Sequence, residues 1–298
     1  MNFFKKIIEL ILNFFNLTKI LSNVKNIAIV LLVFYLSGSN LDWYKLAIGI
    51  ISLSFISSAI YIYNNLSDVR VDKYNKNKNY YSKAVRYFGE KNTLILATIF
   101  IICGFYFGFV INFYFLSGIV ALLITGFLYS SKYTRFKEKV ILDVLFGAML
   151  TFFFRFIASW FIFSISVPPL LAVVALVSAK SAGYMLYKEA DRTYLLALKI
   201  KNSITVVSKK VIIIISALLW FISFFSFIFL CLNSKYFQIE YLGELPFKFL
   251  FLTPFAVPPL IVVYLLVLNK IEIQIKYLRI IGFCYWTLVI VITWNLFL

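Results

Sequence analysis

Long apolar stretches recur along the whole chain and leave no region polar enough to form a separate soluble domain. Hydrophobic residues make up 63% of the sequence and the mean hydropathy is +0.94, far above the values of soluble domains. Several stretches reach the roughly 20 residues that a helix needs to cross the hydrocarbon layer of a bilayer. The sequence therefore predicts an all-α polytopic membrane protein in which residues 1–298 form a single integral-membrane domain.

We predict nine transmembrane helices packed as a bundle around a central cleft. Their expected ranges are 26–37, 43–64, 93–111, 114–131, 140–163, 168–187, 211–232, 247–268 and 278–297. The first range is short, and the third and fourth are nearly continuous. Because Pro254, Pro258 and Pro259 fall inside the eighth range, we expect that helix to be kinked or broken.

Lysine and arginine residues gather in alternate loops. Most of the 29 lie in the N-terminal tail and in 65–92, 132–139, 188–210 and 270–279. The opposite loops hold only Lys45, Lys235 and Lys248. Since cytoplasmic loops are the ones enriched in basic residues, we expect the N-terminus inside and the C-terminus outside. Residues 1–25 then form a cytoplasmic or interfacial segment, in which Met1–Leu17 is an amphipathic helix on the membrane surface.

The net charge of +17 favours anionic lipid headgroups and anionic substrates. Nucleic acid is not an expected partner, because the charge is spread over short loops between spans. The chain has no histidine, which excludes histidine-dependent triads and haem ligation by histidine. Cys103, Cys231 and Cys284 lie in apolar ranges at unrelated spacings, so neither disulfides nor a zinc site is expected.

Acidic residues are scarce, with only 12 in 298, yet two of them stand four apart at the end of the second apolar range. The spacing puts Asn64, Asp68 and Asp72 on one face of a helix, one turn above the next. Carboxylate and amide oxygens suit a hard divalent cation such as Mg²⁺ and, through it, a phosphate or diphosphate. The alternative is a solvated helix end whose aspartates pair with Arg70 and Lys73.

A second charged loop, 188–210, follows the sixth range just as 65–92 follows the second. It begins with Glu189 and Asp191, flanked by Lys188 and Arg192 on one helical face, where the two cations are placed to bind phosphate oxygens. We expect the two loops to close over one site. An ordinary charged loop is the alternative.

The segment from Asn64 to Lys73 resembles the first signature of the UbiA superfamily of membrane prenyltransferases, Asn-Asp-x-x-Asp-x-x-x-Asp, usually followed by arginine. Asn64, Asp68 and Asp72 match it, Lys73 keeps the charge, and Asn65 replaces the first aspartate. The resemblance implies a UbiA-like bundle in which Asn64, Asn65, Asp68 and Asp72 hold Mg²⁺ against a diphosphate, with Asp68 and Asp72 as catalytic residues.

The second signature of that superfamily, Asp-x-x-x-Asp after the sixth span, is matched less closely. Tyr187 stands at its first aspartate, Glu189 is a possible substitute, and Asp191 is the best candidate for a catalytic second-site metal ligand. The resemblance also implies a set of cations for the substrate phosphates, namely Lys73, Lys78, Arg135, Lys188 and Arg192.

Four further segments resemble one subgroup of the superfamily, the polyprenyl-phosphate phosphoribosyltransferases. They are Val24-Lys25-Asn26, Asp143-Val144-Leu145, Phe154-Arg155-Phe156-Ile157-Ala158 and Lys188-Glu189. In the basic run that follows the first motif of the subgroup, only Lys78 clearly matches. This resemblance implies transfer of phosphoribose from phosphoribosyl diphosphate to a polyprenyl phosphate.

Arg155 lies within a predicted span, where an arginine costs on the order of 2.5–3.5 kcal/mol. It either lines a cavity, together with Tyr187, and binds a phosphate or acceptor oxygen, or it reaches the outer interface or a buried tyrosine. Asp143 is expected to be a structural partner of Lys139 or Arg135 rather than a catalyst.

The sequence as a whole favours a Mg²⁺-dependent membrane transferase with an isoprenoid lipid substrate, a phosphorylated or diphosphate co-substrate and an active site facing the cytoplasm. Phosphoribosyl transfer is the favoured subtype. Transfer of a prenyl chain from a polyprenyl diphosphate to an aromatic or other small acceptor is the runner-up. A lipid-binding or transport protein without catalysis is a rival from another class, and an oligomer is compatible with the sequence.

Overall fold

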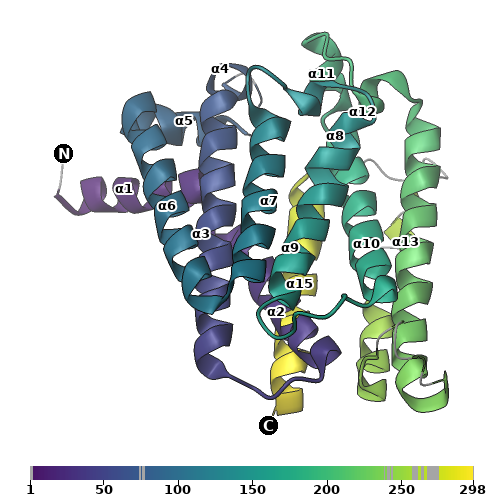
Figure 1. The fold of residues 1–298 in the computed structure, drawn as a ribbon. Coiled ribbons are helices and arrows are strands. Elements are labelled where there is room, and N and C mark those ends of the chain that lie inside the picture. The colour runs from purple at the N-terminus through teal and green to yellow at the C-terminus, as the bar shows by residue number, and fades with distance from the viewer. Residues whose placement is uncertain are drawn as a thin grey trace.

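The computed structural model describes residues 3–73, 75, 78–237, 239, 242, 244–256, 261–262, 265–266 and 275–297. Within these residues every regular element is helical, and the long helices run side by side as a bundle (Figure 1). Seven of the helices described are long and apolar enough to cross a membrane. They are η1 with α2 (Ile20–Ser37), α3 (Trp43–Ser67), α6 (Glu90–Ile111), α7 (Phe113–Ser130), α8 to α9 (Leu142–Trp160), α10 (Leu170–Glu189) and α13 with η4 (Lys209–Phe237).

The first span is longer than predicted because a 3-10 turn, η1 (Ile20–Asn23), leads directly into α2 (Val24–Ser37). The third and fourth spans, α6 and α7, are separated at Asn112, whose backbone is extended. The Asn112 side chain accepts a hydrogen bond from the Phe115 amide at 2.7 Å, so that it caps α7. A single polar residue thus divides what reads in the sequence as one apolar run.

The last predicted span corresponds to α15 (Ile275–Phe297). The eighth range begins as a 3-10 helix, η6 (Phe247–Ala256), and most of its remainder, including Pro258 and Pro259, lies outside the described residues. The predicted break in that helix, the total of nine spans and the central cleft therefore stay predictions.

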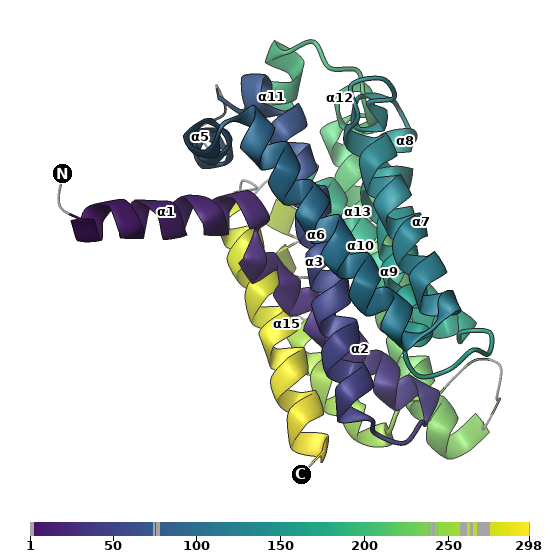
Figure 2. The same ribbon diagram turned by 60° about the vertical axis from the view of Figure 1, so that its left-hand side comes forward.

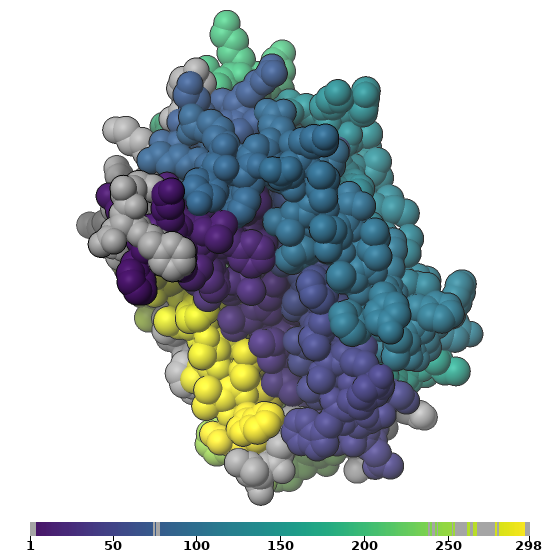
Figure 3. Space-filling model, turned by 90° about the vertical axis from the view of Figure 1, so that its left-hand side faces the viewer, coloured from purple at the N-terminus to yellow at the C-terminus, as the bar shows by residue number. Residues whose placement is uncertain are grey.

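The N-terminal helix α1 (Phe3–Thr18) runs across the bundle instead of along it (Figure 1 and Figure 2). In the space-filling view it lies between the region of α5 (Asn79–Phe88) and α6 on one side and α15 on the other (Figure 3). Apolar side chains such as those of Phe4, Ile8 and Leu12 are exposed along it. The exposed apolar side chains and the crosswise direction are those expected of a helix in a membrane interface, which stays a prediction for α1.

Small residues let the spans approach closely. A Cβ added at Gly118 of α7 would lie 2.9 Å from the Cα of Ala158 in α9 (Leu150–Trp160). A Cβ added at Gly104 of α6 would meet the side chain of Ile56 in α3 at 2.7 Å. Helix association in a bilayer depends on such packing, because lipid tails remove most of the hydrophobic drive between helices.

The span 142–160 is not a regular α-helix. It consists of a short α8 (Leu142–Val144), a π-turn η3 (Leu145–Met149) and then α9. Gly147 in the π-turn leaves space for the rings of Tyr129 and Tyr184, which a Cβ would approach to 2.7 and 2.8 Å. The hydroxyl groups of those two tyrosines lie 2.9 Å apart.

Short helices gather at one end of the bundle, which we call the site end, and the C-terminus lies at the opposite end (Figure 1). The short elements of the site end are α4 (Val69–Asp72), α5, η2 (Phe136–Glu138), α11 (Arg192–Ala197) and α12 (Ser203–Val206). They belong to loops that the sequence shows to be rich in lysine and arginine. The fold therefore collects the predicted polar loops at one end.

Candidate active site

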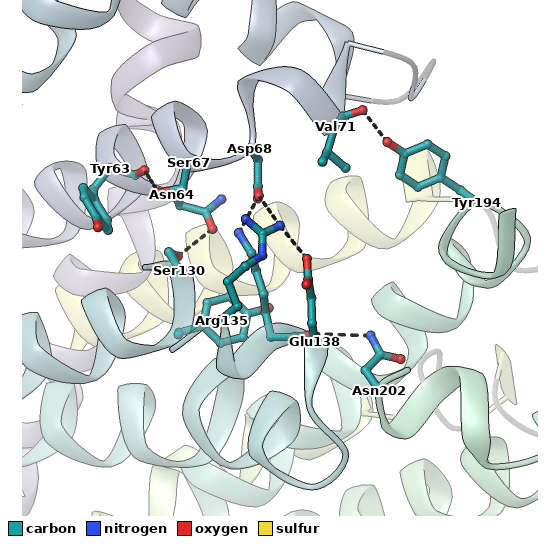
Figure 4. A network of polar contacts seen from close by, with 12 residues as sticks. Tyr63, Asn64, Ser67, Asp68, Val71, Ser130, Arg135, Glu138, Tyr194 and Asn202 are labelled. Carbon is teal, nitrogen blue, oxygen red and sulfur yellow. Dashed lines mark hydrogen bonds and ion pairs between the residues drawn. The ribbon is translucent and has the colours of Figure 1, made fainter. Parts of the chain in front are cut away.

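The first acidic motif sits where α3 ends. Asp68 follows the last residue of α3 and precedes α4, and Asp72 is the last residue of α4. The Asp72 amide donates to the Asp68 carbonyl at 2.8 Å, which continues the helical turn across the junction. One turn earlier, the Asn64 side-chain oxygen accepts from the Ser130 hydroxyl at 2.8 Å (Figure 4).

Two cations of the loop after α7 face Asp68. The Lys137 ammonium lies 2.5 Å from Oδ1 of Asp68. The Arg135 guanidinium lies 3.8 Å from the same oxygen (Figure 4). Burial alone would raise the pKa of Asp68, but the charge and hydrogen bond of Lys137, followed by the charge of Arg135, hold this pKa below its usual value. The carboxyl group of Asp68 is therefore ionised, and the positive charges of Lys137 and Arg135 balance its negative charge.

Asp72 experiences the opposite balance. Its side chain is buried, with 6% exposure, and burial together with the neighbouring charge of Asp68 raises its pKa to about 6. Tyr194 of α11 donates from its hydroxyl to the Val71 carbonyl, which fixes the second loop against α4 (Figure 4). Because the carboxylates of Asp68 and Asp72 repel each other, a cation bound between them would be stabilised.

The second loop contributes Asp191, which is 2% exposed. Lys78 from the first loop places its ammonium 2.6 Å from Oδ2 of Asp191, and Asn75 donates to Oδ1 at 3.4 Å. Burial lowers the pKa of Lys78, but the negative charge of Asp191, followed by that of Asp72, outweighs this effect and leaves the pKa raised. Lys78 is thus a charged link between the two loops, as its distance of 5.8 Å from the Tyr187 ring centroid also indicates.

Glu189 and Arg192, predicted for different roles, are partners of each other. Two nitrogens of the Arg192 guanidinium donate to the two oxygens of Glu189, both at 2.7 Å, and one also donates to the Val207 carbonyl at 2.8 Å. Such bidentate pairs are among the stronger hydrogen bonds in proteins. The pair anchors the second loop to the segment before α13.

Lys188 lies on the inner side of the same helix end. Its ammonium is 5.8 and 5.6 Å from the ring centroids of Tyr129 and Tyr184, and its charge contributes to the lowered pKa of Asp68. Lys73 is exposed just after α4. The structure thus brings Lys188 close to the first motif and leaves Lys73 at its edge.

Asn65 lies on a different face of α3 from Asn64 and Asp68. It is 1% exposed, and its amide group donates to the Leu17 carbonyl at 3.0 Å. The side chain therefore joins α3 to the end of α1. Among the residues predicted for the first metal site, Asn64, Asp68 and Asp72 share one side of the helix end, whereas Asn65 is engaged elsewhere.

Sequence reasoning missed Lys137, Asn75 and Tyr194. Lys137 lies in the basic loop 132–139, two residues after Arg135, so it could have been included with Arg135 among the candidate phosphate-binding cations. Asn75 and Tyr194 contact the site through tertiary packing, and neither carries a local sequence signal.

The predicted partner of Asp143 was wrong. Asp143 is fully buried and accepts a hydrogen bond of 2.5 Å from the Ser203 hydroxyl of α12, while Ser203 in turn accepts from the Ile141 amide at 2.8 Å. Arg135 is instead directed at Glu138 and Asp68. The cause is the turn before the span, which buries Asp143 and turns the basic loop toward α3.

Arg155 does not reach a membrane surface. It is 5% exposed and donates to the side-chain oxygen of Asn26, which is fully buried in α2. Beside it, Lys25 donates to the hydroxyl of Tyr61. Two segments that stand far apart in the sequence, around residues 24–26 and 154–158, are therefore in direct contact.

Within the described residues, no group of three or more acidic, histidine or cysteine side chains is arranged to hold a metal ion alone. Mg²⁺ is ordinarily bound by one or two carboxylates together with the phosphates of a substrate. The pair of Asp68 and Asp72, with the amide oxygen of Asn64 one turn away, fits that mode.

The fold is similar to several solved structures. A UbiA homolog from Archaeoglobus fulgidus bound to GPP and Mg²⁺ superposes with a TM-score of 0.70 at 17% identity, covering 93% of this chain and 99% of that one. An apo UbiA homolog from Aeropyrum pernix K1 gives a TM-score of 0.71 at 14% identity, covering 92% and 97%. A structure of digeranylgeranylglyceryl phosphate synthase gives 0.63 at 17% identity, covering 95% and 98%.

A comparison with curated protein sequences found no match. The model of the UbiA prenyltransferase family, by contrast, matches residues 26–267, which is most of the chain and includes both acidic loops. Together with the helical bundle and the two loops at its site end, this match shows that the chain belongs to the UbiA prenyltransferase family.

Proposed function

We propose that the protein is a Mg²⁺-dependent membrane transferase that binds a diphosphate donor at the site end and transfers its organic group to an isoprenoid lipid. The favoured donor is phosphoribosyl diphosphate and the favoured acceptor is a polyprenyl phosphate. The observation that carries the proposal is the arrangement of three carboxylates, Asp68, Asp72 and Asp191, with Lys78 of the first loop and Lys137 of the loop after α7 in one cluster at the site end.

The donor set fits a Mg²⁺–diphosphate complex. Asn64, Asp68 and Asp72 would hold the first ion, and Asp191 would contribute to a second. Glu189 enters the second set only by giving up its bonds to Arg192, and the side chain of Asn65 is held by the bond from its amide nitrogen to the Leu17 carbonyl. When bound, Mg²⁺ would neutralise the diphosphate and make it a better leaving group.

The cations are already in place for such a ligand. Lys137 and Arg135 pair with Asp68, and Lys78 pairs with Asp191. A diphosphate would accept from these cations in place of the carboxylates, whose oxygens would become available for metal coordination. Fixed donors of this kind stabilise the charge that develops as the bond between the donor's carbon and its diphosphate oxygen breaks.

The phosphoribosyl subtype is supported by the contact between Arg155 and Asn26. Each belongs to a segment that resembles the polyprenyl-phosphate phosphoribosyltransferases, and the fold joins them in a buried site. A prenyl diphosphate donor is the second candidate, because solved structures of similar fold hold GPP or DMAPP with Mg²⁺.

The site end faces the cytoplasm in this proposal, as the concentration of basic residues in its loops supports. A non-catalytic lipid-binding or transport protein would use the same carboxylates for binding and form no covalent product. Product analysis therefore separates these classes.

The deciding experiment supplies the detergent-solubilised protein with Mg²⁺, a polyprenyl phosphate and labelled phosphoribosyl diphosphate. We expect a labelled lipid product in the wild type and none above background with Asp68→Asn. A parallel reaction contains a prenyl diphosphate and an aromatic acid. A product in the second reaction alone would replace the favoured subtype by the runner-up, and binding without any product would support the non-catalytic class.

A further inference from the structure

We propose that a second anion site lies within the membrane-embedded part of the bundle, where Lys25, Arg155 and Lys180 lie around the rings of Tyr61 and Phe152, and that it binds the phosphomonoester headgroup of a lipid acceptor. The choice of a lipid phosphate as the ligand rests on the proposed function. The site itself rests on the side chains described below, which lie apart from the carboxylates of the site end.

The four residues come from four helices that pack together. Lys25 is in α2, Tyr61 in α3, Arg155 in α9 and Lys180 in α10. Lys25 donates to the hydroxyl of Tyr61, and both Arg155 and Lys180 lie over the ring of Phe152, at 5.9 and 5.8 Å from its centroid. The charges of Lys25 and Arg155 act on Lys180. Three cations are therefore concentrated around two neighbouring aromatic rings inside the bundle, Lys25 at Tyr61 and both Arg155 and Lys180 at Phe152.

None of these cations forms an ion pair with a carboxylate of the described residues. The site end differs, because there Lys78 and Lys137 each pair with an aspartate. Charged residues inside membrane proteins normally pair with one another or mark the path of an ion or substrate. Because no carboxylate of the described residues pairs with these buried cations, an anion from outside the chain would be stabilised among them.

Arg155 has a donor directed at no protein acceptor. Its Nε is buried and has no hydrogen-bond partner, while a terminal nitrogen donates to Asn26. Asn26 is itself fixed, since its amide nitrogen donates to Asn23 at 3.2 Å and to Ser57 at 3.3 Å. One side of the guanidinium is thus held in place and the other retains a free N–H. Buried donors are rarely left unsatisfied, and a guanidinium matches the oxygens of a phosphate group.

The surroundings favour a monophosphate over a metal-bound diphosphate. The neutral groups near the cations are amides and hydroxyls, those of Asn23, Asn26, Ser54, Ser57 and Ser58. Because carboxylates are missing from this described set, the cluster offers no negatively charged ligand for Mg²⁺. A single phosphate that accepts from lysine and arginine is the anion that fits.

The position along α10 relates this site to the first one. Lys180, Tyr184 and Lys188 are four residues apart and share one helix face. Lys180 lies about 12 Å below Lys188 along the helix axis, given a rise of 1.5 Å per residue. The acceptor phosphate would therefore lie on the membrane side of the donor's diphosphate, at a depth to which a lipid chain delivers its own headgroup.

The test measures ligand binding to the full-length protein in lipid nanodiscs without Mg²⁺. The probes are farnesyl phosphate, farnesol and inorganic phosphate. We expect farnesyl phosphate to bind at least about tenfold more tightly than farnesol. Equal binding of the phosphate and the alcohol would overturn the proposal, and tight binding of inorganic phosphate alone would overturn the assignment to a lipid.

Variants locate the site. Lys180→Met should weaken farnesyl phosphate binding by about tenfold and leave farnesol binding unchanged, whereas Lys180→Arg should keep the affinity. Lys45→Met, which removes an exposed lysine near the start of α3, is the matched control and should have no effect. An equal loss in Lys45→Met and Lys180→Met would contradict the proposed location.

The same preparations are then tested for thermal protection by phosphoribosyl diphosphate with Mg²⁺, followed by the transfer assay. If transfer to a lipid phosphate occurs but binding shows no preference for farnesyl phosphate over farnesol, this inference fails and the proposed function stands. If farnesyl phosphate binds through Lys180 but phosphoribosyl diphosphate yields no product, the acceptor site stands and the proposed donor fails.

Discussion

The ammonium of Lys137 lies 2.5 Å from Oδ1 of Asp68, so the central aspartate of the first acidic motif is paired with a lysine of the loop after α7. Both side chains are largely buried, with 8% and 14% of their surfaces exposed. The same lysine would thus both hold the ligand-free site together and contribute to diphosphate binding.

Replacement of Lys137 by methionine should therefore destabilise the protein, by on the order of 3 kcal/mol, because it leaves the buried carboxylate of Asp68 without its nearest cation. Denaturant unfolding in detergent measures the change. Lys132→Met, at an exposed position of the same loop, is the control and should cost less than about 0.5 kcal/mol. Adding Asp68→Asn to Lys137→Met should recover part of the loss, and equal losses in the two lysine variants would contradict the importance of this pair.

Asn65→Asp tests whether that position serves the metal site or the fold. The substitution restores the aspartate of the family signature but replaces the donor that bonds the Leu17 carbonyl by an acceptor. We expect a loss of about 2 kcal/mol in unfolding free energy and no gain in Mg²⁺ affinity. Asn92→Asp removes a similar bond, to the Phe88 carbonyl, at an exposed site and should change stability little. Tighter Mg²⁺ binding by Asn65→Asp would show that residue 65 reaches the metal.

Ser203→Ala should destabilise the protein by about 2 kcal/mol, because the fully buried carboxylate of Asp143 loses its hydrogen-bond donor and the Ile141 amide loses its acceptor. Ser117→Ala is the control, since the hydroxyl of Ser117 bonds the Tyr114 carbonyl of its own helix at an exposed position. Unfolding midpoints of the two variants measure the difference. A Ser203→Ala midpoint equal to that of the wild type would mean that Asp143 takes its stabilisation from another group.

Gly118→Ala should disrupt the contact between α7 and α9, because the new Cβ would lie 2.9 Å from the Cα of Ala158, a backbone atom that cannot rotate away. The expected cost is about 1–3 kcal/mol. Gly183→Ala is a matched control within α10, where no atom lies within 4 Å of the added Cβ. Since alanine is favoured over glycine in a helix, that variant should be neutral or slightly more stable. Thermal unfolding of both variants in the same detergent separates packing from helix propensity.

The sequence was sufficient to predict the seven spans found among the described residues, because the length of an apolar segment reflects the thickness of the bilayer. The sequence predicted the first and last residues of the helices less well. The division at Asn112 depends on a capping bond to Phe115, and the start at Ile20 depends on a 3-10 turn. Neither changes the overall apolar pattern, so neither is visible in it.

The site could be predicted only to the extent that its residues share one helix. The four-residue spacing predicted Asn64, Asp68 and Asp72 on one helix face, and in the structure they follow one another along the end of α3 and the short α4. The pairing of Lys78 with Asp191 joins residues 113 positions apart in the sequence and arises from how the loops fold over each other. Likewise, Asn65 follows Asn64 directly but lies on another helix face, so a linear motif alone does not tell which of the two amides faces the carboxylates.

The π-turn at Leu145–Met149 has a consequence for the intramembrane cluster. A turn with one extra residue advances everything after it by one position, which rotates the remainder of the helix by about 100° relative to a regular α-helix. That offset sets the rotational phase of α9 and turns Arg155 toward Asn26 of α2. The direction in which the one arginine of this span points is thus determined by an extra residue two to three helical turns earlier in the sequence.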